Sequence, residues 1–184
     1  MVVSRKVSIF VAKFGIMRFS LFVLMIVFSL SVEAQNAQVA KIRKMYAEAK
    51  EMMANKEKAE LPVDETIVTS NYMAPGAGPV KDVTHYYYSG DFDENLGNVY
   101  YTPYFISRKY NVGARDFYEE FLFDKGDLVF YFSKSENDEI RYYWGPDGFF
   151  HEVIKGKKTM DEVFANRLAH DLKDAFDKLM NREF

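Results

Sequence analysis

Aromatic residues that alternate along the chain between positions 115 and 144 constrain its fold more than any other feature of the sequence. Three successive segments, Arg115–Phe123, Leu128–Ser133 and Ile140–Trp144, place bulky residues at every second position. One side of the first two segments carries Phe117, Phe121, Phe123, Leu128, Phe130 and Phe132, and the other side carries Tyr118, Glu120, Leu122, Val129, Tyr131 and Ser133. In the third segment, one side carries Ile140, Tyr142 and Trp144, and the other carries Arg141 and Tyr143. Because strand side chains point alternately to the two faces of a sheet, this pattern predicts an antiparallel sheet with a buried Phe-rich face and a half-exposed Tyr-bearing face.

Further segments on both sides of this region have the same strand-like composition. Strands are expected at Glu65–Tyr72, Val83–Ser89, Val99–Tyr110, Arg115–Phe123, Asp127–Ser133, Glu139–Trp144 and Phe149–Lys155. Turn-forming residues at Asp124–Asp127, Ser135–Asp138 and Gly145–Gly148 favour hairpins between neighbouring strands. The expected sheet is therefore an antiparallel meander of about six strands.

Two amphipathic helices are expected to flank this sheet. Asn36–Ala59 repeats apolar residues at three- and four-residue steps. The second helix is expected to open at Thr159, where Thr159 and Glu162 form a capping box. Both helices need a surface on which to pack their apolar side, and we expect both to pack on the Phe-rich face. In the alternative, one helix covers each face and the tyrosines become part of the core. The expected fold class is α+β, with residues 35–184 as one domain.

The first 34 residues are expected to form a signal peptide. Four basic residues precede the uninterrupted apolar stretch Phe19–Val32, and Val32-Glu33-Ala34 is a small-residue cleavage site. The 14 residues of that stretch span only about 21 Å as a helix, against roughly 30 Å for a hydrocarbon core. Cleavage before Gln35 is therefore favoured over a retained anchor, and Met17 would be a more ordinary start than Met1. We expect an exported protein, periplasmic or extracellular, without a membrane span after cleavage.

Composition narrows the classes of function. The chain has no cysteine, which excludes disulfides and lipid anchoring at the cleavage site. The 24 basic and 27 acidic residues include four and one, respectively, in the first 34 positions, so the remaining 150 residues carry a net charge of −6. An acidic domain without a basic cluster is a poor candidate for binding nucleic acid or an anionic membrane.

The Tyr-bearing face provides the leading functional hypothesis. Tyr118, Tyr131 and Tyr143 would form a row across an open sheet face, with Glu120 and Arg141 as polar partners. Tyrosine combines a flat apolar ring with a hydrogen-bonding hydroxyl group, which suits protein and glycan surfaces. The sequence thus predicts a non-catalytic binding domain for a protein or a glycan. A homodimer through the same face is a variant of this hypothesis, and the alternative is that tyrosine simply suits half-buried strand positions.

An acidic segment, Asp91–Asn98, is the only candidate for a metal site. Asp91, Asp93 and Asn95 place oxygen donors at alternate positions, as in loops that wrap a calcium ion. Leu96 and Thr102 stand where an EF-hand requires Gly and Glu, so a solvated hairpin loop is the favoured interpretation. No other cofactor is expected.

A small hydrolase is the alternative function. His85 or His151 would act with a carboxylate of the 91–95 loop, which requires the two groups to lie within about 4 Å of each other in a pocket. Glu119 and Glu120 are adjacent on a strand and must point to opposite faces, so they cannot work as a glycosidase pair. Because Glu119 falls on the Phe-rich side, we expect it near an edge or bulge where it reaches water, unless the face assignment slips at that point.

Two sequence patterns resemble those of known proteins. A signal peptide that ends in Ala34-Gln35, a charged first helix and aromatic hairpins resemble small exported proteins of unknown function from Bacteroidota. Phe123-Asp124-Lys125-Gly126-Asp127-Leu128, followed by Arg141-Tyr142-Tyr143-Trp144 and Gly148, is similar to the hairpins of periplasmic inhibitor-like modules, in which a helix packs on an antiparallel sheet. The resemblance implies a binding or inhibitory module in preference to an enzyme and assigns no functional residues.

Overall fold

The computed structural model describes residues 33–55, 63–94 and 97–181. The chain divides into two units, residues 1–40 and residues 41–184. In the first unit the described residues, 33–40, are helical, and the helix continues in the second unit to residue 54. The expected helix Asn36–Ala59 is confirmed as far as residue 54, and its remainder falls largely outside the described residues. Most of the expected signal peptide lies outside them as well.

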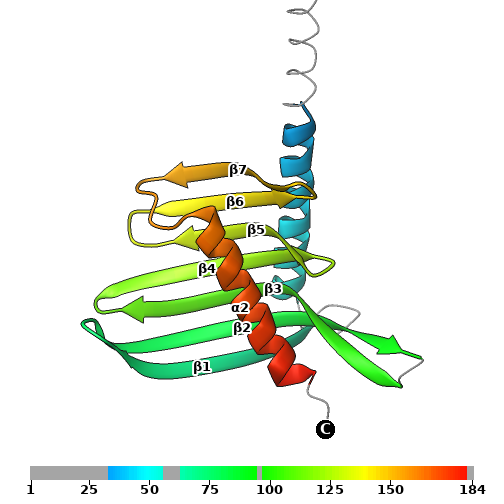
Figure 1. The fold of residues 1–184 in the computed structure, drawn as a ribbon, viewed down its shortest axis with the longest axis horizontal. Coiled ribbons are helices and arrows are strands. Elements are labelled where there is room, and N and C mark those ends of the chain that lie inside the picture. The colour runs from blue at the N-terminus through cyan, green and yellow to red at the C-terminus, as the bar shows by residue number, and fades with distance from the viewer. Residues whose placement is uncertain (1–32, 56–62, 95–96, 182–184) are drawn as a thin grey trace, which may run out of the picture. The chain divides into compact units, whose positions relative to one another are not determined.

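Seven antiparallel strands form one sheet in the order in which they occur along the chain (Figure 1). They are β1 (Asp64–Ala74), β2 (Gly78–Asp93), β3 (Asn98–Val112), β4 (Arg115–Asp124), β5 (Asp127–Lys134), β6 (Glu139–Gly145) and β7 (Gly148–Lys155). The α+β class, the antiparallel meander and all seven strand-like segments are confirmed, although the expected number of strands was about six. β4 lies at the centre of the sheet, and β1 and β7 are its edges.

The hairpin between β4 and β5 decides which side chains share a face. Its turn places both Lys125 and Gly126 at positive φ, 53° and 88°, the backbone geometry of a tight two-residue hairpin. Phe123 pairs with Leu128, but the next pair is Leu122 with Phe130, so Val129 is an extra residue in a β-bulge. A one-residue slip moves all following side chains to the other face.

The predicted separation of a Phe-rich face from a Tyr-bearing face is therefore wrong. Beyond the bulge, Phe121 pairs with Tyr131, and Tyr131 pairs with Tyr142, so these three rings share one face. The opposite face carries Leu122, Phe130 and Tyr143, which are paired in the same way. Each face thus mixes phenylalanine and tyrosine.

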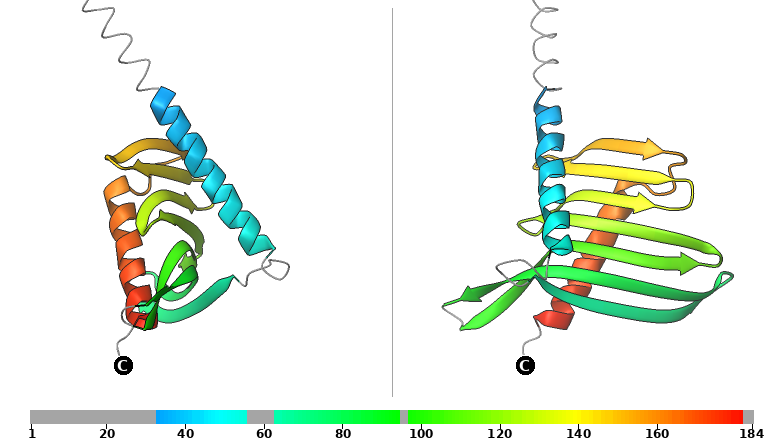
Figure 2. Two further views of the ribbon diagram at one scale, coloured as in Figure 1. Left: turned by 90° about the vertical axis from the view of Figure 1, so that its right-hand side faces the viewer. Right: turned by 180° about the vertical axis from the view of Figure 1, so that it is seen from behind.

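One helix covers each face of the sheet. The C-terminal helix α2 (Glu162–Met180) packs on the face of Phe121, and its Phe176 ring lies 5.3 Å from Tyr86. On the other face, the Tyr46 ring of the N-terminal helix lies 5.0 Å from Phe130 and 6.1 Å from Phe105. Figure 2 shows α2 and the cyan end of the N-terminal helix on opposite sides of the sheet. The expectation that both helices pack on one face of the sheet is wrong, and the alternative, one helix on each face, is confirmed.

The start of α2 differs from the prediction. The N-cap is Asp161, whose carboxylate accepts a hydrogen bond from the Phe164 amide at 2.7 Å, and the capping box at Thr159 does not form. Small residues, Ala165 and Ala169, are buried against the sheet together with Phe176. Within the described residues, neither helix is long and apolar enough to cross a membrane.

Candidate binding pocket

Four of the five predicted site residues lie on one face of the sheet, and the fifth lies on the opposite face. Tyr118, Glu120, Arg141 and Tyr143 all lie on the face that the N-terminal helix covers, as the cross-strand pairs show. Tyr131 lies on the opposite face, beneath α2, and is completely buried. The three tyrosines therefore do not form one row. Their side chains are not an open surface either, because Tyr143 is 1% exposed.

Glu120 is the anchor of the N-terminal helix. Its carboxylate is 1% exposed and accepts hydrogen bonds from the hydroxyl groups of Tyr46 and Tyr118, both at 2.5 Å. The ammonium group of Lys50, one helical turn beyond Tyr46, donates to it at 2.6 Å. Burial first, and the hydrogen bond to Glu120 second, raise the pKa values of Tyr46 and Tyr118. Both tyrosines therefore remain protonated donors, and the buried carboxylate is fully partnered.

A pocket of about 380 Å³ opens beside this anchor. It lies between the N-terminal helix and strands β5, β6 and β7, and it is lined by Arg43, Tyr46, Phe130, Phe132, Arg141, Tyr143 and Val153. The rings of Phe130 and Tyr143 lie 5.1 Å apart at its floor. Arg43 and Tyr46 share the helix surface that faces the pocket because they are three residues apart.

The two charged residues that line the pocket are both arginines. The Arg43 guanidinium lies 6.0 Å above the Tyr143 ring, and the Arg141 guanidinium lies 5.2 Å above the Phe132 ring. Arg141 also forms an ion pair with Glu139, whose carboxylate is 3.2 Å from the Lys155 ammonium group. No carboxylate is among the residues that line the pocket. Two guanidinium groups over a floor of rings can hold an anionic group that is attached to a flat apolar body.

Glu119 is fully buried on the opposite face of β4. Arg108 bridges it to Asp82, with Nη1 3.4 Å from Glu119 and Nη2 2.5 Å from Asp82. The Tyr131 hydroxyl donates to Glu119 at 3.0 Å, and burial raises the pKa of this carboxyl group. Glu119 therefore sits at the centre of the sheet, and the expectation that it reaches water at an edge is wrong. That Glu119 and Glu120 point to opposite faces is confirmed.

Comparison with protein-family models, curated proteins and solved structures gives no match to this chain.

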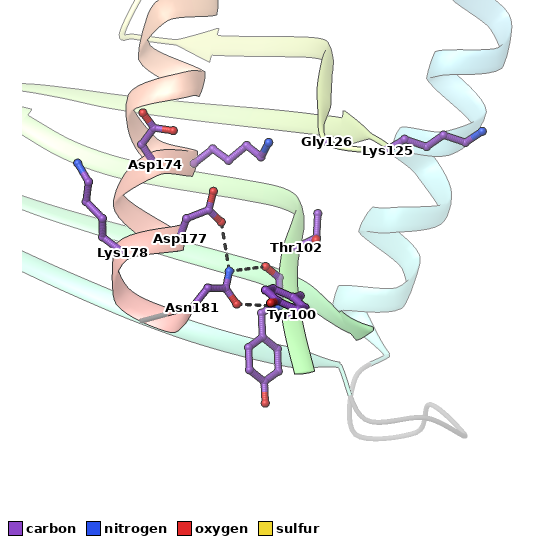
Figure 3. Close-up of a pocket in the computed structure, with 10 residues that line it drawn as sticks. Tyr100, Thr102, Lys125, Gly126, Asp174, Asp177, Lys178 and Asn181 are labelled. Carbon is purple, nitrogen blue, oxygen red and sulfur yellow. Dashed lines mark hydrogen bonds between the residues drawn. The ribbon is translucent and has the colours of Figure 1, made fainter. Parts of the chain in front are cut away.

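A wider hollow of about 850 Å³ lies at the C-terminal end of α2 (Figure 3). Asn181 closes one side of it: its amide nitrogen donates to the Tyr101 carbonyl at 2.9 Å, and its amide oxygen accepts from the Tyr101 N–H at 2.9 Å. Lysines and aspartates both line this hollow, including Lys173 and Asp174. Its mixed charge and its helix-anchoring amide indicate a structural junction rather than a selective site.

The histidines lie away from the acidic segment that was expected to assist them. His85 Nδ1 is 2.7 Å from a carboxylate oxygen of Glu65, on the neighbouring strand β1. The His151 ring lies 5.4 Å from the Tyr143 ring. Neither histidine is among the residues that line the pocket between β5–β7 and the helix.

Asp91 and Asp93 of the acidic segment lie in strand β2, within a projecting pair of strands. β2 and β3 extend past the neighbouring strands (Figure 1), and Asp91 and Asp93 pair with Tyr100 and Asn98 in this extension. Asn95 lies outside the described residues. Within those residues, no group of three or more histidine or acidic side chains is placed to hold a metal ion.

The sequence predicts some of the residues that line the pocket but not all of them. Arg141 and Tyr143 were identified, whereas Arg43 and Tyr46 were not connected with them, because contacts between a helix and a distant sheet leave no local pattern. Phe130 and Phe132 were assigned to the wrong face by the bulge after Leu128. The three-residue spacing of Arg43 and Tyr46 is the one local signal that places both on a single helix surface.

Proposed function

We propose that residues 41–184 form a non-catalytic binding domain whose pocket accepts an anionic group of a protein or glycan partner. The observation that carries this proposal is the pair Arg43 and Arg141 above a floor of aromatic rings, with no carboxylate in the lining. The binding surface moves from the open tyrosine face that the sequence predicts to a pocket between a helix and three strands.

The size and chemistry of the pocket favour a carboxylate on a ring. A volume of about 380 Å³ is at the small end of ligand pockets, which span roughly 300–1,000 Å³. Aromatic floors stack against sugar and aromatic rings, and guanidinium groups bind carboxylates through paired hydrogen bonds. Two ligand sources share this chemistry: an acidic sugar of a glycan, and an acidic residue beside an aromatic residue in a protein.

Binding measurements with matched ligands test the proposal. Calorimetry should compare a uronate oligosaccharide with its neutral counterpart, and an acidic aromatic peptide with its amidated form. Arg43→Met should weaken binding of the charged ligand by about tenfold or more, because it removes charge-assisted hydrogen bonds of about 1.5–3 kcal/mol. Arg167→Met, at an exposed position on α2, is the matched control. Unchanged affinity in a folded R43M variant would show that the pocket is not the site.

His85 and Glu65 support a second candidate function, a hydrolase. Their 2.7 Å contact is that of an imidazole oriented by a carboxylate. Ser107 on β3 is the direct cross-strand neighbour of His85, which places a hydroxyl group on the same face. A fluorophosphonate probe should label Ser107 in the parent chain and not in H85A. If Ser107 stays unlabelled, this candidate is removed.

We also propose that the domain works outside the cytoplasm. The proposal rests on the basic and apolar segments before Val32-Glu33-Ala34 and on the resemblance to exported proteins of Bacteroidota. N-terminal sequencing of the protein recovered from an exporting host should begin at Gln35. A chain that retains residues 1–34 would contradict the proposal.

A further inference from the structure

We propose that the outer edge of β1 pairs with β1 of a second copy of this chain, in an antiparallel arrangement with Ser70 opposite Ser70. This inference goes beyond the binding pocket and uses no residue that lines it.

The edge of β1 is long and lacks the features that usually protect an edge. Among the described residues, β1 pairs with β2 alone, and it runs for 11 residues. The nine residues Thr66–Ala74 contain no charge, proline or glycine. Native edge strands are normally short, or carry charges or prolines, because unpaired backbone groups would otherwise pair with another chain.

The opposite edge of the sheet is protected. β7 has eight residues, and its pairing with β6 is interrupted by a bulge between Tyr143 and Trp144. Its charged residues are engaged in ion pairs: Glu152 with Lys158 at 3.0 Å, and Lys155 with Glu139 at 3.2 Å. The two edges therefore differ, and only β1 has the character of a pairing surface.

Three large apolar side chains are exposed along β1: Ile67 at 55%, Tyr72 at 47% and Met73 at 71%. In an antiparallel pair, directly opposed residues point to the same face of the sheet. When both strands have the same sequence, the numbers of two opposed residues must therefore differ by an even number. Centring the pair on Ser70 places Ile67 opposite Met73 and Val68 opposite Tyr72. Centring it on Thr69 would instead place Ile67 opposite Asn71 and Met73 opposite Glu65.

The Ser70-centred register is therefore self-complementary. It covers the two most exposed apolar side chains of the strand with each other, and it leaves Asp64 and Glu65 outside the paired segment. The same nine residues satisfy both sides of the contact, which is the requirement for a two-fold symmetric dimer. This self-matching is the reason to propose a second copy rather than a different protein as the partner.

Cysteine cross-linking tests the register directly, because the chain has no cysteine of its own. In Ser70→Cys, expressed from the full-length chain, the two thiols face each other across the axis. Mild oxidation should give a covalent dimer, since opposed residues lie about 4.5–5.5 Å apart and a disulfide needs a Cα separation below about 7 Å.

Two further variants are the controls. Ile67→Cys should not cross-link to itself, because its two copies would be about 20 Å apart along the strands. A mixture of Ile67→Cys and Met73→Cys should form the mixed disulfide. Absence of the S70C dimer overturns the proposal, and so does self-cross-linking of I67C as efficient as that of S70C.

Sedimentation equilibrium tests the same contact without cross-linking. The unmodified protein should approach twice its single-chain mass as its concentration rises. Ser70→Lys places like charges opposite each other and should leave a monomer under the same conditions. Ser89→Lys, the same change at an exposed position of β2, should remain dimeric. A parent chain that is monomeric at every concentration, or a monomer whose β1 edge instead captures a segment of another protein, overturns the proposal.

Discussion

The two faces of β4 each bury a carboxylate, and the two carboxylates are neutralised by different parts of the molecule. Glu119 is held by Arg108 of β3 and Tyr131 of β5, so its partners belong to neighbouring strands. Glu120 is held by Tyr46 and Lys50 of the N-terminal helix, together with Tyr118 of its own strand. Glu119 therefore holds neighbouring strands together on one face of the sheet, whereas the adjacent Glu120 holds the N-terminal helix on the other face.

The difference extends to how the two helices are attached. α2 buries Ala165, Ala169 and Phe176 against rings of the sheet, and this contact is apolar and non-directional. The N-terminal helix also packs on rings, but its attachment includes two hydrogen bonds, from Tyr46 and Lys50, to a single buried charge. Buried charges become costly as soon as one partner is lost. The helix beside the pocket should therefore be the one that a single substitution can release.

High pH should give the largest effect and should act on both faces. Tyr46 and Tyr118 near Glu120, and Tyr110 and Tyr131 near Glu119, all have raised pKa values, mainly through burial. The folded chain therefore keeps protons that the unfolded chain releases near pH 10. Stability is fully present below that pH and is lost above it, by up to about 1.4 kcal/mol per pH unit for each tyrosine. Urea unfolding at pH 8 to 11, with tyrosinate absorbance recorded in parallel, measures this loss. Ionisation of all 13 tyrosines near pH 10 in the folded protein would contradict it.

Arg108→Met should cause the next largest loss. The substitution leaves the buried carboxylates of Asp82 and Glu119 without their cation, which costs about 3–5 kcal/mol of unfolding free energy. Adding Glu119→Gln to Arg108→Met should recover part of this loss, because it removes one of the two charges. Urea denaturation at pH 7 measures both changes. Arg167→Met, on the exposed surface of α2, is the control, and an equal effect of the two methionine variants would remove the role assigned to Arg108.

Glu120→Gln should loosen the N-terminal helix specifically. Loss of charge-assisted hydrogen bonds from the helix should cost about 1.5–3 kcal/mol. Hydrogen exchange in residues 41–54 should increase more than in α2. Glu48→Gln makes the same substitution within the N-terminal helix itself, at a carboxylate that is 58% exposed, and it should leave exchange unchanged. Equal protection of the helix in both variants would show that Glu120 is not its anchor.

Tyr46→Phe and Tyr131→Phe should have the smallest effects on stability. They should also distinguish the two faces of the sheet most clearly, because each changes a different one. Each removes one hydroxyl donor to a buried carboxylate and should cost about 1 kcal/mol. In Tyr46→Phe the increase in hydrogen exchange should appear in residues 41–54, and in Tyr131→Phe it should appear in β4 and β5. Tyr100→Phe, at an exposed ring, is the control. The same exchange pattern in both variants would mean that the two faces are not independent.

Only part of the candidate site can be predicted from the sequence. Arg141 and Tyr143 could be identified because they alternate within one strand, and their position on one face is confirmed, whereas the bulge at Val129 interrupts the expected alternation in β5. Arg43 and Tyr46 join them only because a helix nearly 100 residues earlier in the chain lies over β5–β7. No periodicity along the chain encodes that contact.

The sequence by itself determined the secondary structure, the meander of antiparallel strands and the opposite orientation of Glu119 and Glu120. These features follow from the period of two along a strand and from turn chemistry, both of which are local. Only the tertiary structure decided which rings share a face. One extra residue at Val129 moves Phe130 and Tyr131 to opposite faces from those expected. The bulge is set by how two strands pair and twist, and so the positions of the pocket and of both buried carboxylate clusters depend on contacts between segments rather than on any one segment.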